Sequence, residues 1–171
     1  MSIDFEFTSD YSSWDVEKLN NIAEKVSEAV DKKLRLPKCA SVAVLLCNNA
    51  KIQRLNKDFR ASDKATNVLS WPNEDLRVVP PGQLPNLATN PQLGDLAMAY
   101  EVCFLESRVG RISFSDHLAH LLLHGTLHLL GYDHMEDTDA LIMEAIEIEV
   151  LAKMCISCLL YTSPSPRDGL L

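Results

Sequence analysis

The sequence predicts a single α+β domain in which a mixed sheet of about four strands is packed by helices on at least one face. The chain has 171 residues, which is enough to bury one core and too few for two ordinary domains. Hydrophobic residues make up 47% and charged residues 23%, a composition typical of globular proteins. Short apolar segments alternate with longer segments of helical periodicity, a pattern typical of helices packed on a sheet.

The first half of the chain predicts two strands and two helices. Residues 3–7 alternate between apolar and acidic side chains, the period of a half-buried strand. Residues 16–34 repeat apolar side chains with the helical period and predict the first helix. The valine-rich run 40–47 predicts a central strand, and residues 50–59 predict a second helix.

The second half predicts two more strands, separated by a long loop. Residues 67–71 and 93–100 have strand composition, and residues 101–108 are expected to be helical. The loop 72–92 contains five of the eight prolines, so we expect an extended surface excursion, a kind of segment that is often functional.

Two further helices follow in the C-terminal third. Ser115 is expected to cap the first of them, and Gly131 suits the left-handed position just past its end. The last helix is predicted at about 138–153, with glutamates on its solvated face. Its buried face is expected to carry Leu141, Ile142, Ala145 and Ile146.

The charge distribution limits the nucleic-acid surface to one region. The formal net charge of −8 argues mildly against a general nucleic-acid binder, because affinity for phosphates depends on clustered Lys and Arg. The dense basic feature is a series in the second helix, where a cation recurs every three residues. It consists of Lys51, Arg54, Lys57 and Arg60. For the first three, an ordinary solvated helix face is an equally good interpretation.

All five histidines fall between residues 117 and 134, the first four of them on a predicted helix that is otherwise rich in leucine. Two histidines one helical turn apart can bind one cation, and the pairs 120/124 and 124/128 both have this spacing. The continuation selects the second pair, because Gly131 ends the helix and lets the chain turn back toward His134. We therefore predict one zinc ion bound by His124, His128 and His134.

Three imidazoles leave the fourth tetrahedral position for water, which is typical of a catalytic zinc. The spacing matches the His-Glu-x-x-His-x-x-Gly-x-x-His metalloproteases, except that Gly125 replaces their glutamate base. This replacement argues against a peptidase. The alternative of ordinary core histidines is usual for a lone histidine and less suited to three at this spacing. His117 and His120 are expected to support the site or to pack rather than to bind metal.

The same residues carry a resemblance to a known family. The segment HGTLHLLGYDH at 124–134 resembles the motif of the YbeY endoribonucleases. The segments LNKDFR at 55–60, TNVLSW at 66–71 and LGDL at 93–96 are also similar to family segments. Trp71 replaces the family's phenylalanine, and the loop 72–92 looks longer than the family core needs. The resemblance spans about residues 1–153.

The resemblance implies a metalloprotease-like (zincin-like) fold and a zinc-dependent, single-strand-specific endoribonuclease. Its expected role is ribosomal RNA maturation at the 3′ end of the small-subunit RNA, and ribosome quality control. The expected partners are ribosomal RNA, small-subunit proteins and an assembly GTPase.

The resemblance also assigns roles to individual residues. His124 and Arg60 are implied in catalysis, with Arg60 holding the scissile phosphate. Asp133 is expected either to orient a ligand or to cap the following turn. Lys51, Arg54 and Lys57 would extend the RNA contact.

Two other functions remain open at this point. A zinc peptidase is favoured by the ligand spacing and opposed by Gly125. A ribosome-assembly module with a purely structural zinc is opposed by the fourth coordination position.

The ends of the chain and the cysteines bear on location. The N-terminus lacks the pattern of a signal peptide, and five scattered cysteines suit a reducing compartment, so we expect a cytoplasmic protein without a membrane segment. Residues 154–171 are expected to form a non-native or poorly packed tail. In this tail, Cys155 and Cys158 have the spacing of half a zinc knuckle but lack the other half.

Overall fold

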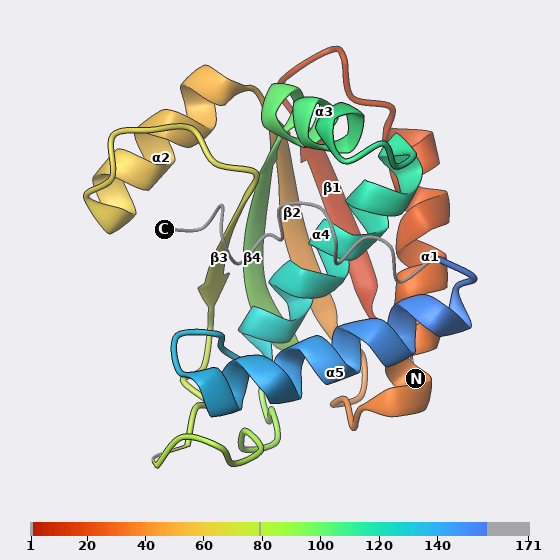
Figure 1. Ribbon diagram of the computed structural model, residues 1–171, viewed down its shortest axis with the longest axis vertical. Coiled ribbons are helices and arrows are strands. Elements are labelled where there is room, and N and C mark those ends of the chain that lie inside the picture. The colour runs from red at the N-terminus through yellow and green to blue at the C-terminus, as the bar shows by residue number, and fades with distance from the viewer. Residues whose placement is uncertain (1, 79, 157–171) are drawn as a thin grey trace.

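The computed structural model describes residues 2–78 and 80–156, and it contains the predicted mixed sheet. Four strands lie in the order β1-β2-β4-β3, and Figure 1 shows them side by side. They are β1 (Asp4–Ser9), β2 (Ser41–Cys47), β3 (Val68–Pro72) and β4 (Gln92–Ala99). The pairs β1–β2 and β2–β4 are parallel, whereas β3 is antiparallel to β4 and forms one edge.

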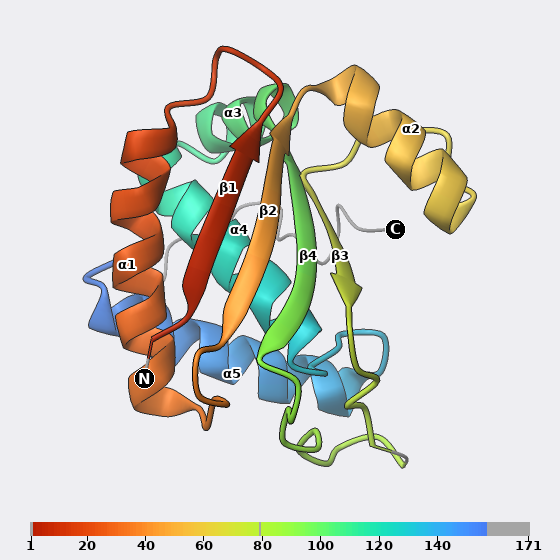
Figure 2. The ribbon, with the colours of Figure 1, turned by 180° about the vertical axis from the view of Figure 1, so that it is seen from behind.

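Five helices pack around this sheet. They are α1 (Val16–Lys33), α2 (Asn49–Arg60), α3 (Tyr100–Val109), α4 (Phe114–Leu129) and α5 (Asp137–Lys153). Helices α1 and α4 lie along one face, and α5 crosses beside the end of α4 (Figure 1). Figure 2 shows the opposite face, where α2 lies beside one end of the sheet. The predicted fold class is therefore confirmed.

The two faces of the sheet have separate cores. Alternate residues of β2, Val42, Val44 and Leu46, belong to the large core formed with α1, α4 and α5, as the two-residue period of a strand requires. Leu45 and Cys47, at the alternate positions of β2, point to the other face and join a smaller core beneath α2. The sheet thus fixes α4 on one side and α2 on the other.

Helix α4 begins two residues earlier than the sequence suggested, so the expectation that Ser115 caps it is wrong. The N-cap is Ser113, whose side chain accepts a hydrogen bond of 3.0 Å from the backbone N–H of Asp116. Ser113 has extended backbone angles, whereas Ser115 already lies within the first turn. Both residue types suit an N-cap, and the backbone conformation decides between them. Asp116 still lies in the positive first turn.

The buried face of α5 also differs from the expectation. Leu141 is 68% exposed and Ala145 is exposed, whereas Ile146 is buried as predicted. The buried set of α5 is Ala140, Met143, Ile146, Glu147, Val150 and Leu151. Apolar residues occur all around this helix, so they do not single out one face, and the true face includes a glutamate that the sequence interpretation placed in solvent.

The loop between β3 and β4 is mostly exposed, as expected, but it is anchored to the domain. Leu76 is buried, and the Glu74 carboxylate accepts hydrogen bonds from the backbone of Thr89 and Asn90. Across the domain, the Gly82 N–H donates to Asp139 Oδ1 of α5 at 2.7 Å. The loop therefore forms a fixed wall beside the start of α5.

The predicted tail is described only at its beginning. Ile156 departs from the expectation of poor packing, because it is buried in the main core and its N–H donates to Leu151 O at 3.0 Å. Residues 157–171, which include Cys158, lie outside the described residues. Within the described ranges, no helix combines the length and apolar character needed to span a bilayer.

Candidate metal centre

Three histidines converge where α4 ends. His124 and His128 lie one turn apart on α4, and the chain returns His134 to them before α5 begins. The ring centroids are 4.7 Å apart for His124 and His128, 5.3 Å for His124 and His134, and 4.8 Å for His128 and His134. One nitrogen from each ring lies within 4.8 Å of the others. The three side chains could therefore hold a metal ion.

Gly131 makes this return of the chain possible. Its φ of +95° is a conformation that side chains rarely adopt. The Tyr132 N–H then donates to Leu127 O at 3.0 Å, a bond typical of a glycine-terminated helix. A Cβ at this position would also lie 2.8 Å from Leu76 Cβ and 2.9 Å from Pro85 Cβ. Glycine is therefore required both by the turn and by the close approach of the loop.

The hydrogen bonds of two rings identify which nitrogens are available to a metal. His128 Nδ1 lies 3.0 Å from the Tyr132 carbonyl, which only accepts, so this nitrogen carries the proton. His124 Nδ1 lies 3.0 Å from Glu147 Oε1. The two Nε2 atoms then face each other at 3.1 Å. Two lone pairs at this distance repel unless a cation lies between them, so the donor set fits a bound metal.

The distance agrees with known coordination geometry. Zinc–imidazole bonds of about 2.0–2.1 Å in a tetrahedral site place two ligand nitrogens roughly 3.4 Å apart, close to the 3.1 Å between the two Nε2 atoms. Neutral imidazoles suit zinc and several other transition metals.

Burial keeps His128 neutral, the form in which it can bind a cation. Burial lowers the pKa of His128 well below its usual 6.5, and the neighbouring rings of His124 and His134 lower it further. For Glu147, burial raises the pKa, but hydrogen bonds from His120 and His124 outweigh it and hold the pKa at about 2. At neutral pH the site thus contains a neutral His128 beside the ionised Glu147 carboxylate.

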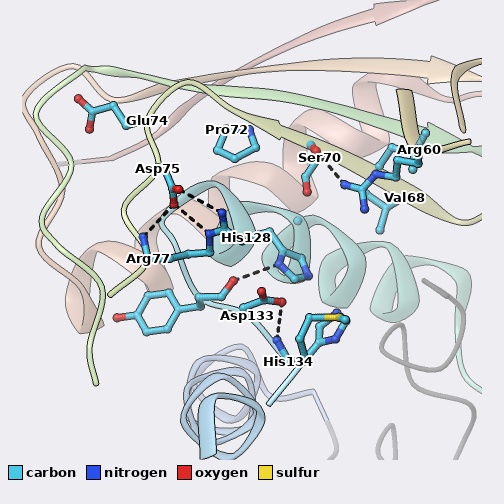
Figure 3. Close-up of a pocket in the computed structure, with 14 residues that line it drawn as sticks. Arg60, Val68, Ser70, Pro72, Glu74, Asp75, Arg77, His128, Asp133 and His134 are labelled. Atoms are coloured by element: carbon cyan, nitrogen blue, oxygen red, sulfur yellow. Dashed lines mark hydrogen bonds and ion pairs between the residues drawn. The ribbon is translucent and has the colours of Figure 1, made fainter. Parts of the chain in front are cut away.

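His128 and His134 line a cavity of about 400 Å³ between α4, the edge strand and the loop (Figure 3). Arg60, at the end of α2, lines it and donates from Nη2 to Ser70 O at 3.1 Å. Arg77, from the loop, also lines it and is held by Asp75 at 2.9 and 3.1 Å. The cavity is therefore lined by the imidazoles of His128 and His134 and by the guanidinium groups of Arg60 and Arg77.

Gly125 lines the same cavity at the position where peptidases of this spacing carry glutamate. A Cβ here would lie 2.9 Å from Leu96 Cδ2 and 3.4 Å from Val68 Cγ2. Since Leu96 is buried, a larger side chain requires the core to shift. The carboxylates that line the cavity are Glu74, Asp75 and Asp133.

Of the other predicted site residues, some line the cavity and others do not. The lining includes Arg60 but none of Lys51, Arg54 and Lys57, and Lys57 lies 3.7 Å from Asp63. Asp133 lines the cavity, and its Oδ1 accepts from the His134 N–H at 2.7 Å, which is closer to the capping interpretation.

The two remaining histidines of α4 contact carboxylates. His120 Nε2 lies 2.6 Å from Glu147 Oε2, and His117 Nε2 lies 3.0 Å from Glu106 Oε1. Both rings are buried, and neither belongs to the converging triad.

Sequence reasoning missed Glu147 and Arg77. A signal for Glu147 was present, because it follows Met143 and precedes Val150 at helical spacing on the buried face. A glutamate at an apolar position predicts a buried partner. Arg77 had no such signal, since its place depends on how the loop folds back.

Comparisons with known proteins agree with this geometry. The model of the family described as Endoribonuclease YbeY matches residues 4–155. Endoribonuclease YbeY of Jannaschia sp. is 39% identical, with 89% of this chain and 96% of the relative covered. Endoribonuclease YbeY of Dinoroseobacter shibae is 41% identical, with 85% and 84% covered.

A solution structure of a protein from Thermotoga maritima shares the fold. Its TM-score is 0.54 at 24% identity, with 90% of this chain and 91% of that chain covered. The sequence matches and the histidine centre lead to the same assignment: the chain belongs to the YbeY endoribonuclease family.

Proposed function

We propose that this protein is a zinc-dependent, single-strand-specific endoribonuclease that processes ribosomal RNA. The proposed substrate region is the 3′ end of the small-subunit RNA, with a further role in ribosome quality control. One zinc ion would be held by His124, His128 and His134. The observation that carries the proposal is the convergence of three imidazole nitrogens within 4.8 Å at a cavity that Arg60 also lines.

A zinc ion at this position would polarise a phosphoryl oxygen or lower the pKa of a bound water. The protein's own contribution is to place a phosphate against that centre. The Arg60 guanidinium is oriented by the Ser70 carbonyl at the cavity, and its planar fork suits a phosphate diester with growing negative charge. His124 would act by holding the zinc ion, and Arg60 would hold the reacting phosphate at the cavity.

The remaining cations of α2 would guide the RNA toward the cavity. Lys51, Arg54 and Lys57 lie on the same helix as Arg60, outside the cavity lining, where contacts to flanking phosphates add affinity without sequence preference. His120 would support the centre through Glu147, and Asp133 would fix the turn that carries His134.

The cellular setting is proposed from the family. We infer a cytoplasmic protein that works with small-subunit ribosomal proteins and an assembly GTPase, in a domain that spans residues 1–153.

The two alternatives are less well supported. A peptidase needs a general base that Gly125 does not supply, and the tight packing against Leu96 opposes a larger residue there. A purely structural zinc does not explain why the centre opens onto a cavity of about 400 Å³.

The proposal is tested on the wild-type protein with three substrates. Metal content is measured, and cleavage of a single-stranded RNA is compared with cleavage of the same sequence as a duplex and with hydrolysis of a peptide library. We expect zinc near one equivalent, cleavage of the single strand alone, and loss of cleavage after chelation that added zinc restores. Peptide hydrolysis, or RNA cleavage that survives chelation, would overturn it.

A further inference from the structure

Glu147 is an ionisable residue in an unusual position. It belongs to α5, its side chain is 4% exposed, and it lies among the apolar residues that pack on α4. A buried carboxylate is costly unless its oxygens are paired. Both oxygens are: Oε2 lies 2.6 Å from His120 Nε2, and Oε1 lies 3.0 Å from His124 Nδ1.

We propose that Glu147 is a positioning residue of the metal centre, which holds His124 in the tautomer and orientation that direct Nε2 toward the metal. This inference rests on the proposed metal-dependent function. Glu147 lies behind His124, on the side away from His128, and it would not contact the metal or the RNA. Its effect on the reaction would pass through the His124 ring.

The geometry of His124 carries the argument. An ionised carboxylate only accepts hydrogen bonds, so the His124 Nδ1 beside it must carry the proton. The neutral ring then has its lone pair on Nε2, the atom that lies 3.1 Å from His128 Nε2. A carboxylate behind a ligating imidazole also makes that imidazole a stronger donor to the metal.

His120 completes the arrangement by holding the other oxygen. With one oxygen fixed by His120, the carboxylate cannot rotate away from His124 without losing a bond of 2.6 Å. The two ligands on α4 are therefore supported differently: His124 by an anion and His128 by the neutral carbonyl of Tyr132. This difference predicts that His124 is more sensitive to its partner than His128.

The chain offers a matched control on the same helix. His117 Nε2 lies 3.0 Å from Glu106 Oε1, and Glu106 also accepts from Asn67 Nδ2 at 3.1 Å. This pair likewise joins a buried histidine of α4 to a carboxylate of another helix, but His117 is not a member of the triad. Removing the charge of Glu106 therefore tests the structural effect of losing a buried histidine–carboxylate contact, without a change beside the metal ligands.

The experiment compares Glu147→Gln with Glu106→Gln. Zinc affinity is measured by competition with a chromophoric chelator, thermal stability by calorimetry, and the His124 tautomer by side-chain ¹⁵N shifts in the metal-free protein. We expect Glu147→Gln to weaken zinc binding about 10- to 100-fold and to lower the Nδ1–H population of His124. Glu106→Gln should lower the melting temperature and leave zinc affinity within about twofold, because Glu106 contacts His117 and none of the three proposed metal ligands.

Several outcomes would overturn the proposal. An unchanged zinc affinity in Glu147→Gln, or equal weakening in both variants, would make Glu147 a structural brace. If Glu147→Gln does not fold, Glu147→Asp is used instead, because it keeps the charge but reaches less far toward His124. Unchanged zinc affinity together with unchanged His124 shifts in Glu147→Asp would then overturn the proposal. If the wild type binds zinc but does not cleave RNA, the proposed function fails while the positioning role of Glu147 stands.

Discussion

The two walls of the cavity are built in opposite ways. The histidine wall belongs mainly to α4, whose residues from His117 to Leu127 are all buried, and the rings of His124 and His128 donate hydrogen bonds to the Glu147 carboxylate and the Tyr132 carbonyl. The arginine wall consists of Arg60 at the end of α2 and Arg77 in the loop, and both side chains are exposed. The side chains of the proposed metal site are thus held in place by the fold, whereas the arginines proposed to bind phosphate are exposed to solvent.

This difference follows from what each wall must bind. A metal requires several atoms at fixed distances, which side chains held by packing and hydrogen bonds provide. A polynucleotide must enter and leave, and exposed cations contact it without the cost of being buried unpaired. Changes to the histidine wall should therefore affect metal binding and catalysis together, and changes to the arginine wall should affect catalysis alone.

The largest effect is expected for His128→Ala. This change removes the central ligand, whose Nε2 lies 3.1 Å from that of His124. We expect loss of zinc and of RNA cleavage, both measured on one preparation. Retention of stoichiometric zinc would show that the other two histidines suffice and would contradict the assignment of this wall.

Arg60→Glu tests the opposite wall. It should reduce cleavage by about 100- to 1000-fold or more, the cost of removing a charge-stabilising group, while zinc content stays at the wild-type level. Lys25→Glu, an exposed residue of α1 outside the cavity, is the control with the same change in charge. Equal losses in the two variants would mean that only overall charge matters.

Gly131→Ala tests how the third ligand is held. The backbone conformation alone should cost about 1–2 kcal/mol, and the contacts with Leu76 and Pro85 at 2.8 and 2.9 Å should add to this and displace His134. Gly82→Ala is the matched control, because its φ of +93° is similar but the nearest atom lies 3.5 Å away. We expect weaker zinc binding in Gly131→Ala only. Similar zinc affinity in both variants would contradict the proposed role of the glycine turn.

The smallest effect concerns the pH dependence of the metal-free protein. Because the pKa of His128 is well below 6.5 in the folded state, the unfolded chain binds more protons than the folded protein near this pH. The free energy of unfolding that depends on neutral His128 is therefore fully present above pH 6.5 and is lost as the pH falls below that value. Denaturant unfolding between pH 7.5 and 5 should show this decline. His128→Gln should flatten it, and an unchanged slope would show that His128 is not the buried neutral group.

The histidine wall was more predictable from sequence than the arginine wall. The spacing of His124, His128 and His134 around Gly131 is a local pattern, and local geometry brings the rings together. Arg60 was identified from the family resemblance, and its contact with Ser70 depends on how α2 meets the edge strand.

The features that sequence reasoning missed depend on tertiary packing. Glu147 contacts residues more than twenty positions away, and its burial depends on which side of α5 meets α4. The same ambiguity led to the wrong face for α5, since apolar residues surround that helix. The choice of Ser113 over Ser115 as the cap of α4 depended on backbone angles that two nearby serines do not distinguish.

The central claim is that three imidazoles bind one metal ion and leave a position for solvent. X-ray absorption spectroscopy at the zinc edge of the loaded protein measures this directly. The expected result is three imidazole ligands and one light oxygen ligand at about 2.0 Å, with the imidazole count reduced in His134→Ala. A sulfur ligand near about 2.3 Å, or a shell unchanged by His134→Ala, would contradict it.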